Sequence, residues 1–368
     1  MKPTILVTSA AGHTGAAVVE KLREQDHSVR ALVRRRDARS ERLQRLGAEV
    51  IVGNLYDWRD LRGALSGVER AYHCAPFAPY MLHGSMLFAL AAEAAQLEVV
   101  VWMSAWNPHA VHPAIHQREH WLANNLHGWM PTVRSIHVNP GLFAFTYFFG
   151  LQAAVHFGEL MLPYGEGENA PPSNEDIAAV VAALLADPEP HIGRKYRPTG
   201  PRLITGHDAA EILGRVLGRR VRYRDVSTRM FVKAGLALGL SRFEVSQIRY
   251  YAEELRGGTY AIGAPSDHVE VVTGRPPEDF EATARRYVAQ PDLVMQGLRV
   301  GTKLDAVRQM IRTVRTRVPD LDAWVEESGH PSIGAPQLAH ENPDWREVAH
   351  QRRLLLPDRA PTGQALTL

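Results

Sequence analysis

Three histidines stand four residues apart in this chain, at His112, His116 and His120. The segment 112–126 has a helical pattern, and residues four apart share one face of a helix. Imidazole titrates near neutral pH, so such a side chain can give or take a proton. Ser104 ends the preceding apolar run VVVWMS and places a hydroxyl nearby. We therefore predict a proton-transfer site made of Ser104, His116 and His120, with His116 as the acid.

The same helix allows a second interpretation, as a metal site. His116-x-x-Glu119-His120 matches an inverted zinc-protease motif, and two histidines four apart on a helix can share a zinc ion. No convincing acidic ligand follows downstream, and the surrounding pattern is not that of a protease. We predict that no metal is bound, with zinc as the alternative.

The loop TSAAGHTG, residues 8–15, has small residues where a phosphate-binding loop requires them. Ser9, Gly12 and Gly15 are three apart, where three glycines are usual. Small residues let backbone N–H groups approach a pyrophosphate, and a helix N-terminus adds partial positive charge. The loop joins a strand to a helix and a second strand follows, which is the context this motif needs. The predicted dinucleotide contacts are Thr8, Ser9, Ala11, Gly12, His13, Thr14 and Gly15.

The end of the second strand indicates which dinucleotide is bound. An NAD site places Asp or Glu there to bind the ribose hydroxyls, whereas this chain reads Val33-Arg34-Arg35-Arg36. A guanidinium forms charge-assisted, forked hydrogen bonds with a phosphate. We predict NADP(H) as cofactor and Arg34 as the partner of its 2′-phosphate. A solvated arginine turn is the alternative.

The elements that must position these residues alternate along the first half of the chain. The expected strands are all apolar rather than alternating, which indicates parallel strands buried on both faces. They cover residues 4–8, 28–33, 49–53, 69–74, 99–104 and 135–139, with helices over 12–23, 40–46, 61–65, 85–96 and 112–126. This pattern predicts a doubly wound α/β sheet of the Rossmann type.

After residue 150 the pattern changes, and we expect three parts in the chain. Residues 1–150 form the dinucleotide-binding domain, and residues 151–290 form a smaller mixed α/β lobe that could close over the cofactor. Residues 291–368 form a helical and irregular C-terminal extension. Leu304, Val307 and Met310 begin an amphipathic helix in that extension, which could wrap the body or mediate a homodimer.

Several stretches resemble the NmrA-like branch of the atypical short-chain dehydrogenases/reductases, over about residues 4–290. They are ILVTSAAGHTG, VRALVRRRDA, GNLYD, NPGLFA and the run from NEDIAAVV to GRRVRY. Ser9 replaces the usual first glycine, and Asn54 stands where the family usually has Asp. NPGLFA resembles the turn beside the nicotinamide. With the positions at the strand ends, the resemblance implies further cofactor contacts at Asn54, Leu55, Ala75, Pro76, Ser104, Asn139, Pro140, Gly141 and Phe143.

The resemblance also draws attention to a missing pair of residues. Short-chain dehydrogenases commonly use Tyr and Lys four apart on the helix after the fifth strand, where the Tyr transfers a proton. Residues 112–126 contain neither, and the whole chain has only five Lys. His116 stands at about the position of that Tyr. The ordinary alcohol-dehydrogenase apparatus is therefore absent.

Two functions are consistent with these features. An aromatic run near the expected nicotinamide would suit a flat apolar acceptor, such as a quinone, an aromatic compound or an activated alkene or carbonyl. Its members are Trp106, Phe143, Phe145, Tyr147, Phe148 and Phe149, although packing between lobes would also explain them. We expect an NADPH-dependent oxidoreductase that transfers a hydride to such an acceptor. The alternative is a non-catalytic NAD(P)-sensing regulator of a partner protein.

The composition is that of an ordinary globular chain. Its 368 residues carry a net charge of +2, which gives no indication of a nucleic-acid or membrane partner. A single cysteine, Cys74, excludes an intramolecular disulfide. We see no signal peptide and no apolar run that could span a bilayer, so we expect a cytoplasmic protein.

Overall fold

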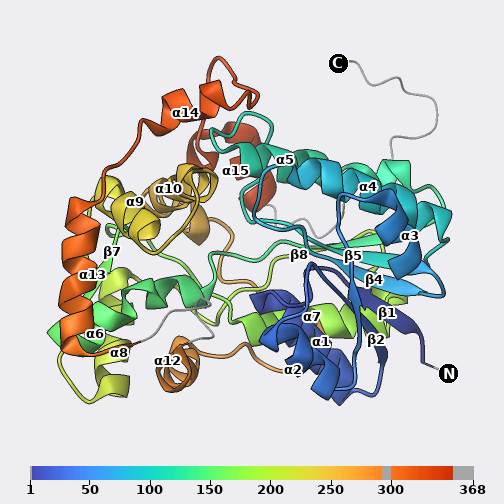
Figure 1. The fold of residues 1–368 in the computed structure, drawn as a ribbon, viewed down its shortest axis with the longest axis horizontal. Coiled ribbons are helices and arrows are strands. Elements are labelled where there is room, and N and C mark those ends of the chain that lie inside the picture. Colours follow the sequence, from blue (N-terminus) through green and yellow to red (C-terminus); the bar gives the residue numbers. More distant parts are fainter. Residues whose placement is uncertain (1, 292–299, 351–368) are drawn as a thin grey trace.

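Seven strands form one parallel sheet in the order β3-β2-β1-β4-β5-β6-β8 (Figure 1). The computed structural model describes residues 2–291 and 300–350. The order is that of the Rossmann fold with β8 added at one edge, which confirms the predicted fold class. The strands are β1 (Thr4–Val7), β2 (Ser28–Val33), β3 (Glu49–Val52), β4 (Arg70–His73), β5 (Val99–Met103), β6 (Arg134–Val138) and β8 (Lys195–Tyr196).

Helices cover both faces of this sheet. One face carries α1 (His13–Glu24), α2 (Ala38–Arg45), α7 (Asn174–Ala186) and α11 (His268–Thr273), and the other carries α3 (Trp58–Leu65), α4 (Met81–Ala94), α5 (Ile115–Ala123) and η1 (Leu126–Trp129). Ile5 and Val7 belong to one buried cluster and Leu6 to the other. Adjacent strand residues point to opposite faces, so both faces need apolar residues.

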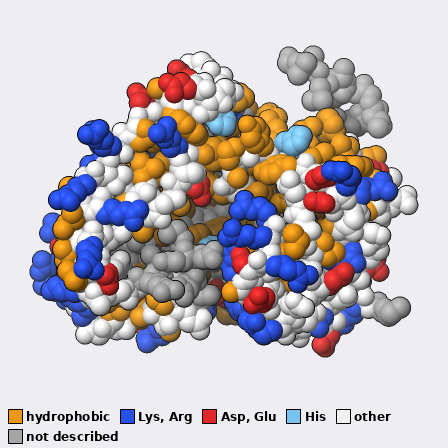
Figure 2. Space-filling model, in the orientation of Figure 1, with side chains coloured by type: hydrophobic (Ala, Val, Ile, Leu, Met, Phe, Trp, Pro, Cys, Tyr) orange, Lys and Arg blue, Asp and Glu red, His pale blue; other side chains and the backbone are white. Residues whose placement is uncertain are grey.

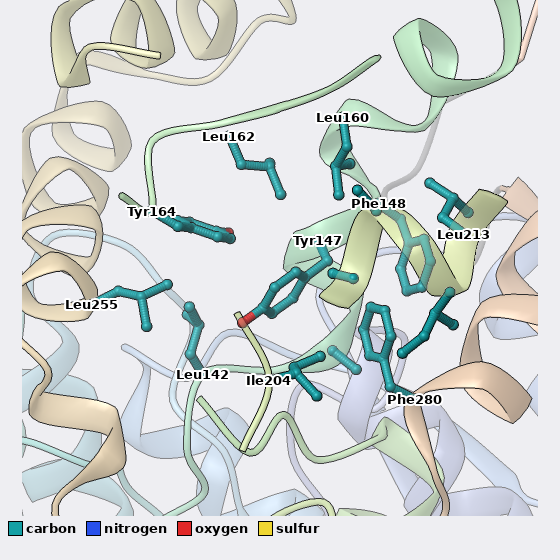
Figure 3. Packing of buried hydrophobic residues seen from close by; sticks show 14 of the residues in the cluster. Leu142, Tyr147, Phe148, Leu160, Leu162, Tyr164, Ile204, Leu213, Leu255 and Phe280 are labelled. Atoms are coloured by element: carbon teal, nitrogen blue, oxygen red, sulfur yellow. The ribbon is translucent and has the colours of Figure 1, made fainter. Parts of the chain in front are cut away.

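A second, smaller body packs beside the sheet. Its parallel pair β7 (Glu159–Leu162) and β9 (Arg222–Asp225) is surrounded by η2 (Ala144–Gly150), α6 (Leu151–Phe157), α8 (Gly206–Leu217), α9 (Thr228–Ala237), α10 (Arg242–Arg256), η4 (Thr259–Ala261) and α12 (Phe280–Ala289). Tyr147 and Phe148 pack against Phe280 in its core, with ring centroids 5.2 and 5.4 Å apart (Figure 3). These two aromatic residues therefore stabilise the lobe and do not line the expected substrate site.

The three-part division of the chain stays a prediction, and the chain does not pass through the parts in order. Residues 151–290, expected to form the lobe, include α7, β8 and α11. However, α7 packs on α1 and β8 pairs with β6, so they belong to the sheet domain. The short η3 (Glu189–His191) connects α7 to β8. The lobe is therefore built from three separate stretches of chain, residues 144–162, 206–261 and 280–289.

The C-terminal extension lies along the outside of the lobe. It comprises α13 (Lys303–Arg315), α14 (Leu321–Glu327), η6 (Ala339–Glu341) and α15 (Pro343–His350). α13 packs on α9 and α6, yet Leu304, Met310, Ile311 and Val314 remain at least 45% exposed. The predicted homodimer through this extension stays a prediction.

The visible face of the molecule is mixed in character (Figure 2). Lys and Arg side chains spread over it, and hydrophobic side chains gather in the upper part. Within the described ranges 2–291 and 300–350, no helix has the length and apolar character needed to cross a membrane.

Three predicted helices differ at their start by three or four residues: those expected from residues 61 and 85 begin earlier, at Trp58 and Met81, and the one expected from residue 112 begins later. The helix expected from His112 begins only at Ile115, so His112 does not share a helix face with His116 and His120. The Nδ1 of His112 accepts a hydrogen bond from the backbone N–H of Ala114, at 2.9 Å, which holds this segment in a turn before the helix.

Buried histidines make the fold sensitive to acid. His73 in β4 is 2% exposed and lies between the hydroxyls of Thr8 and Ser85, at 3.4 and 3.2 Å. Burial, with a smaller effect of His120, lowers the pKa of His73 to about 3. Burial also lowers the pKa of His137 well below 6.5. Both rings are therefore neutral in the folded protein at physiological pH.

We predict that the free energy of unfolding falls as the pH drops below 6.5. An unfolded histidine binds a proton near pH 6.5 while the folded one does not, so each contributes a slope of about 1.4 kcal/mol per pH unit. Urea unfolding at pH 8, 6.5 and 5 measures the slope. His73→Gln is expected to reduce the slope of the unfolding free energy with pH by about 1.4 kcal/mol per pH unit. Replacement of the exposed His83 is the control and should leave the slope unchanged. Equal stability at pH 8 and 5 would contradict this account.

Candidate active site

The loop between β1 and α1 is held by its small residues. Ser9 has a φ of 48°, the left-handed conformation in which glycine is usual, and its hydroxyl donates to the carbonyl of Cys74 at 2.7 Å. A Cβ on Gly15 would lie 2.5 Å from the carbonyl oxygen of Ser9. The predicted roles of both positions therefore have a geometric basis: Ser9 makes the turn, and Gly15 permits the close approach.

The N-terminus of α1 is suited to an anion. Its N-cap is Gly12, no side chain caps the helix, and its first turn has no acidic residue. Unsatisfied N–H groups at a helix start attract phosphate oxygens. The loop residues therefore fit the pyrophosphate of a dinucleotide. His13 stacks on Phe145 with ring centroids 5.3 Å apart, which brings the loop next to the lobe.

Arg34 follows β2 and is exposed. Within residues 2–291 and 300–350 it forms no ion pair, whereas Arg35 lies 3.6 Å from Asp37. The Asp37 carboxylate accepts from the backbone N–H groups of Arg39 and Ser40 and caps α2. Its bond to the Arg39 side chain holds the pKa of Asp37 below its usual value. This nearby acid is therefore engaged locally, and Arg34 is free to meet a phosphate.

The next predicted cofactor residues follow β3 and β4. Asn54 uses its side-chain oxygen to accept from the backbone of Tyr56, at 3.1 Å, so it builds the turn. Leu55 packs against the sheet core. Ala75 lines a cavity between the sheet and the lobe, and the next residue, Pro76, is partly buried.

A cavity of about 330 Å³ lies where the sheet meets the lobe. Phe77, Met103, Ser104, Trp106, His116 and His120 come from the sheet side, and Phe143, Phe145, Phe149, Tyr164, Phe231, Tyr251 and Tyr260 from the lobe side. Within residues 2–291 and 300–350, none of the residues that line it is Lys, Arg, Asp or Glu. The cavity can therefore take a flat apolar molecule at the carboxyl ends of the strands, where open α/β sheets bind ligands.

The expected nicotinamide turn lies in the wall of this cavity. Pro140, Gly141 and Phe143 line it, and Asn139 donates to the carbonyl of Ala105 at 2.7 Å. The Asn139 side-chain oxygen and the Ser104 hydroxyl are buried without a hydrogen-bond partner in the described chain. An unsatisfied buried polar atom costs about 1–3 kcal/mol. These two atoms fit a site that receives polar groups from a cofactor.

His116 and His120 form a pair at the cavity wall. Their Nε2 atoms are 3.2 Å apart, and both side chains are buried. Burial, with His120 adding to it, lowers the pKa of His116 well below 6.5, and burial lowers the pKa of His120 to about 4. At neutral pH both rings are therefore neutral, with one Nε2–H donating to the other Nε2. The sequence argument that imidazole titrates near pH 7 does not hold in this environment.

Sequence reasoning missed the side of the cavity formed by the second half of the chain. Tyr251 accepts a hydrogen bond from Gln117 at 2.9 Å, and Gln247 accepts from the backbone of His116 at 3.1 Å. Both belong to α10. The apolar stripe of α10 could be seen in the sequence, but its neighbour lies more than one hundred residues away.

The fold and the cavity define the class of this protein: it is a Rossmann protein with a site for a dinucleotide. A sequence profile described as the NmrA-like family matches residues 1–254. The chain belongs to this family.

Similar proteins include enzymes and a regulator. An NAD(P)H azoreductase of Xenophilus azovorans is 29% identical over 292 residues, 77% of this chain and 98% of its own. An NADPH-dependent quinone oxidoreductase of Escherichia coli, solved with NADPH, has a TM-score of 0.67 and 22% identity, over 77% of this chain and 99% of its own. The negative transcriptional regulator NmrA with NAD has a TM-score of 0.62 and 16% identity, over 81% and 99%.

We predict that Gly15→Ala weakens NADPH binding at least about tenfold, because the new methyl group pushes α1 away from the loop. Titration of the purified protein with NADPH, followed by nucleotide fluorescence, measures the dissociation constant.

Gly63→Ala is the matched control, because Gly63 lies in α3 and a Cβ there meets no atom within 4 Å. It should leave NADPH binding unchanged and favour its helix slightly. Equal NADPH affinity in Gly15→Ala and the wild type would show that the loop does not form the nucleotide site.

Proposed function

We propose that this protein is an NADPH-dependent reductase whose acceptor is a flat, largely apolar electrophile bound in the cavity between sheet and lobe. The observation that carries the proposal is the cavity wall: aromatic side chains surround the cavity, and among the described residues no Lys, Arg, Asp or Glu lines it. The azoreductase and quinone oxidoreductase relatives are reductases by name. Quinones and aromatic azo compounds are the acceptors that we would test first.

The residues present fit NADP(H). The loop from Thr8 to Gly15 and the start of α1 hold the pyrophosphate, Arg34 meets the 2′-phosphate, and Asn139 to Phe143 flank the nicotinamide. When bound, the nicotinamide supplies a hydride. Reduction of a quinone to a hydroquinone then needs one further proton to balance the charge, so the protein must admit a proton while excluding bulk water.

The cavity wall performs the remaining tasks. Phe145, Phe149 and Tyr251 present ring faces and edges that orient a flat molecule. The hydroxyl of Ser104 and the neutral pair His116–His120 are the polar groups in the wall nearest the strand ends. We assign the proton to His116, whose neutral N–H donates to the developing oxyanion while the ring regains a proton from His120 or from water. Water alone is the alternative source.

A second function rests on one observation. The wall contains no tyrosine–lysine pair on α5, and the NAD-bound regulator NmrA shares the fold. A regulator would bind NADP(H) and pass no hydride. The two functions separate in one experiment, because both predict nucleotide binding and only the reductase consumes NADPH.

The first test mixes the protein and NADPH with a panel of quinones, azo dyes and activated alkenes and follows nicotinamide absorbance. Consumption with any acceptor supports the reductase. Tight NADPH binding with no consumption across the panel favours the regulator, and failure to bind either NADPH or NADH would remove both.

We predict that Arg34→Ala raises the dissociation constant of NADPH about tenfold or more and leaves that of NADH unchanged, because only NADPH carries the phosphate that Arg34 meets. Arg36→Ala is the control, since Arg36 is equally exposed on the same turn. An equal loss of affinity for NADH and NADPH would contradict the assignment of Arg34.

We predict that His116→Ala lowers kcat about 100-fold and leaves NADPH affinity unchanged, as expected for loss of a proton donor. In the wild type, kcat should show no inflection near pH 6.5, because burial lowers the pKa of His116. His83→Ala controls for loss of an exposed histidine. An unchanged kcat in His116→Ala would assign the proton to water, and a wild-type inflection at pH 6.5 would mean that the charged imidazolium acts.

A further inference from the structure

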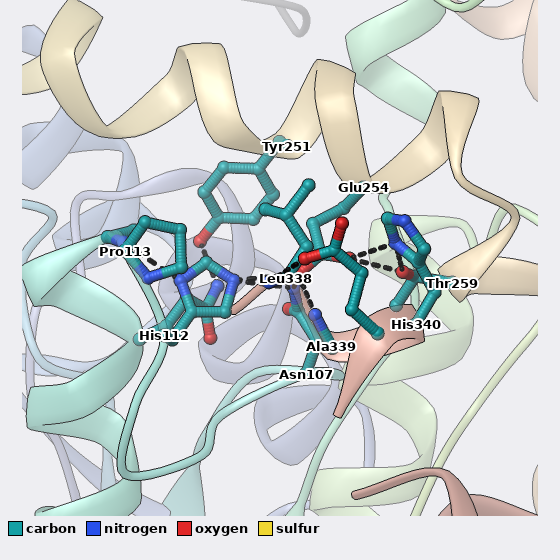
Figure 4. A network of polar contacts seen from close by, with 12 residues as sticks. Asn107, His112, Pro113, Tyr251, Glu254, Thr259, Leu338, Ala339 and His340 are labelled. Atoms are coloured by element: carbon teal, nitrogen blue, oxygen red, sulfur yellow. Dashed lines mark hydrogen bonds and ion pairs between the residues drawn. The ribbon is translucent and has the colours of Figure 1, made fainter. Parts of the chain in front are cut away.

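Glu254 near the end of α10 is a fully buried carboxylate that ties distant parts of the chain together (Figure 4). Its Oε1 accepts from Asn107 at 3.1 Å, from His112 at 2.8 Å and from the backbone N–H of Ala339 at 2.7 Å. Its Oε2 accepts from His340 at 3.2 Å and from the hydroxyl of Thr259. Five donors therefore surround one carboxylate, and two of them come from the C-terminal extension.

The charge of Glu254 depends on these donors. Burial by itself raises the pKa of the carboxyl, but the hydrogen bonds from His112, His340 and Thr259 outweigh it, so the pKa lies well below its usual value. No Lys or Arg in the described chain pairs with Glu254; there, the basic side chains within 4 Å of its carboxylate are the imidazoles of His112 and His340. A buried carboxylate that loses one donor is left partly unsatisfied, which is costly.

The cluster of His109, His112 and Glu254 has the side chains of a metal site, with one ligand atom from each within 4.8 Å of the others. The protonation of His112 argues against that function. Its Nδ1 accepts from the backbone of Ala114, so its Nε2 carries the hydrogen that it donates to Glu254. A metal ligand needs a bare nitrogen at that position. The geometry describes a hydrogen-bonded junction.

The segments that meet at Glu254 are those that form the cavity wall. α10 contributes Ile248, Tyr251 and Ala252 to the wall, the residue after Thr259 is Tyr260, and the segment before Asn107 contributes Trp106. α5 is joined to α10 by Gln117–Tyr251 and by His116–Gln247. Glu254–His112 continues this row of contacts towards the end of α10.

The extension is fitted closely into this junction. Gly257 leaves the space for His340, because a Cβ there would lie 2.0 Å from the imidazole ring. Trp345 is buried and lies 5.9 Å from the guanidinium of Arg197, which stacks at 3.3 Å on Trp106 of the cavity wall. Gly257, His340 and Trp345 lie beyond the end of the family match at residue 254.

We propose that His340 and Glu254 are positioning residues for the substrate: through them, residues 337–350 brace the back of the cavity wall and set its affinity for the acceptor. Neither side chain lines the cavity, so the effect passes through α10, Tyr260 and Trp106. The proposal rests on the proposed reductase function. It predicts an effect on acceptor binding without one on the nucleotide, whose loop at residues 8–15 contacts Cys74 and Phe145 rather than this junction.

The experiment compares His340→Ala with His340→Asn in the full-length protein. The Asn amide nitrogen can replace the imidazole Nδ1 as donor to Glu254, and Ala cannot. With menadione as the quinone, we expect His340→Ala to raise KM about tenfold, with kcat and the NADPH dissociation constant unchanged. His340→Asn should restore KM to within about threefold of the wild type. His350→Ala, an exposed histidine of the same extension, is the control.

A second measurement does not need turnover. Menadione binding is followed by quenching of tryptophan fluorescence, since Trp106 lies in the cavity wall, and the dissociation constants should follow the KM series. If wild type binds menadione but does not oxidise NADPH, the proposed function fails for quinones and these constants still decide the positioning proposal. Unchanged menadione binding in His340→Ala, a parallel loss of NADPH binding or folding, or an Asn variant as impaired as Ala would each overturn it.

Discussion

The tightest steric constraint in this protein is the close packing of the first helix against the end of the first strand. The carbonyl oxygen of Ser9 lies so close to position 15 that only glycine, which has no Cβ, fits there. This close packing directs the start of α1 towards the carboxyl edge of the sheet. The free N–H groups there are useful only if no side chain or acid competes for them, and none does. Arg34 and the Asn139–Phe143 turn follow the ends of β2 and β6 at the same edge of the sheet.

A second constraint concerns charge at the other end of the site. The cavity wall is apolar, and its two histidines and the carboxylate behind it are each held in one protonation state by burial or hydrogen bonds. Burial keeps the His116–His120 pair neutral, while five donors keep Glu254 charged behind the wall. Since none of the described residues in the wall is a carboxylic acid, the proton that balances a hydride must come from a neutral donor or from water.

The sequence alone was sufficient for six strands of the sheet and for the nucleotide loop because both are local, whereas β8 lies in the part expected to form the lobe and yet pairs with β6. Each strand is a short apolar run bounded by turn residues, and the loop, its helix and Arg34 lie within the first 36 residues. It was insufficient where the chain returns from a distance. Tyr147 and Phe148 belong to the same aromatic run as Phe145 and Phe149, and only the packing of Phe280 shows which of them face the lobe core.

His112 shows the limit of spacing as evidence. Its four-residue separation from His116 is the separation that a helix would need, yet Ala114 donates to its ring and the helix starts later. The imidazole is then directed to a carboxylate 142 residues away, and the turn that holds it also decides its tautomer. The same residue type therefore serves two different purposes within nine positions: at His112 it donates to a buried anion, and at His116 and His120 it remains neutral in an apolar wall. Burial and partners, which spacing does not encode, separate the two roles.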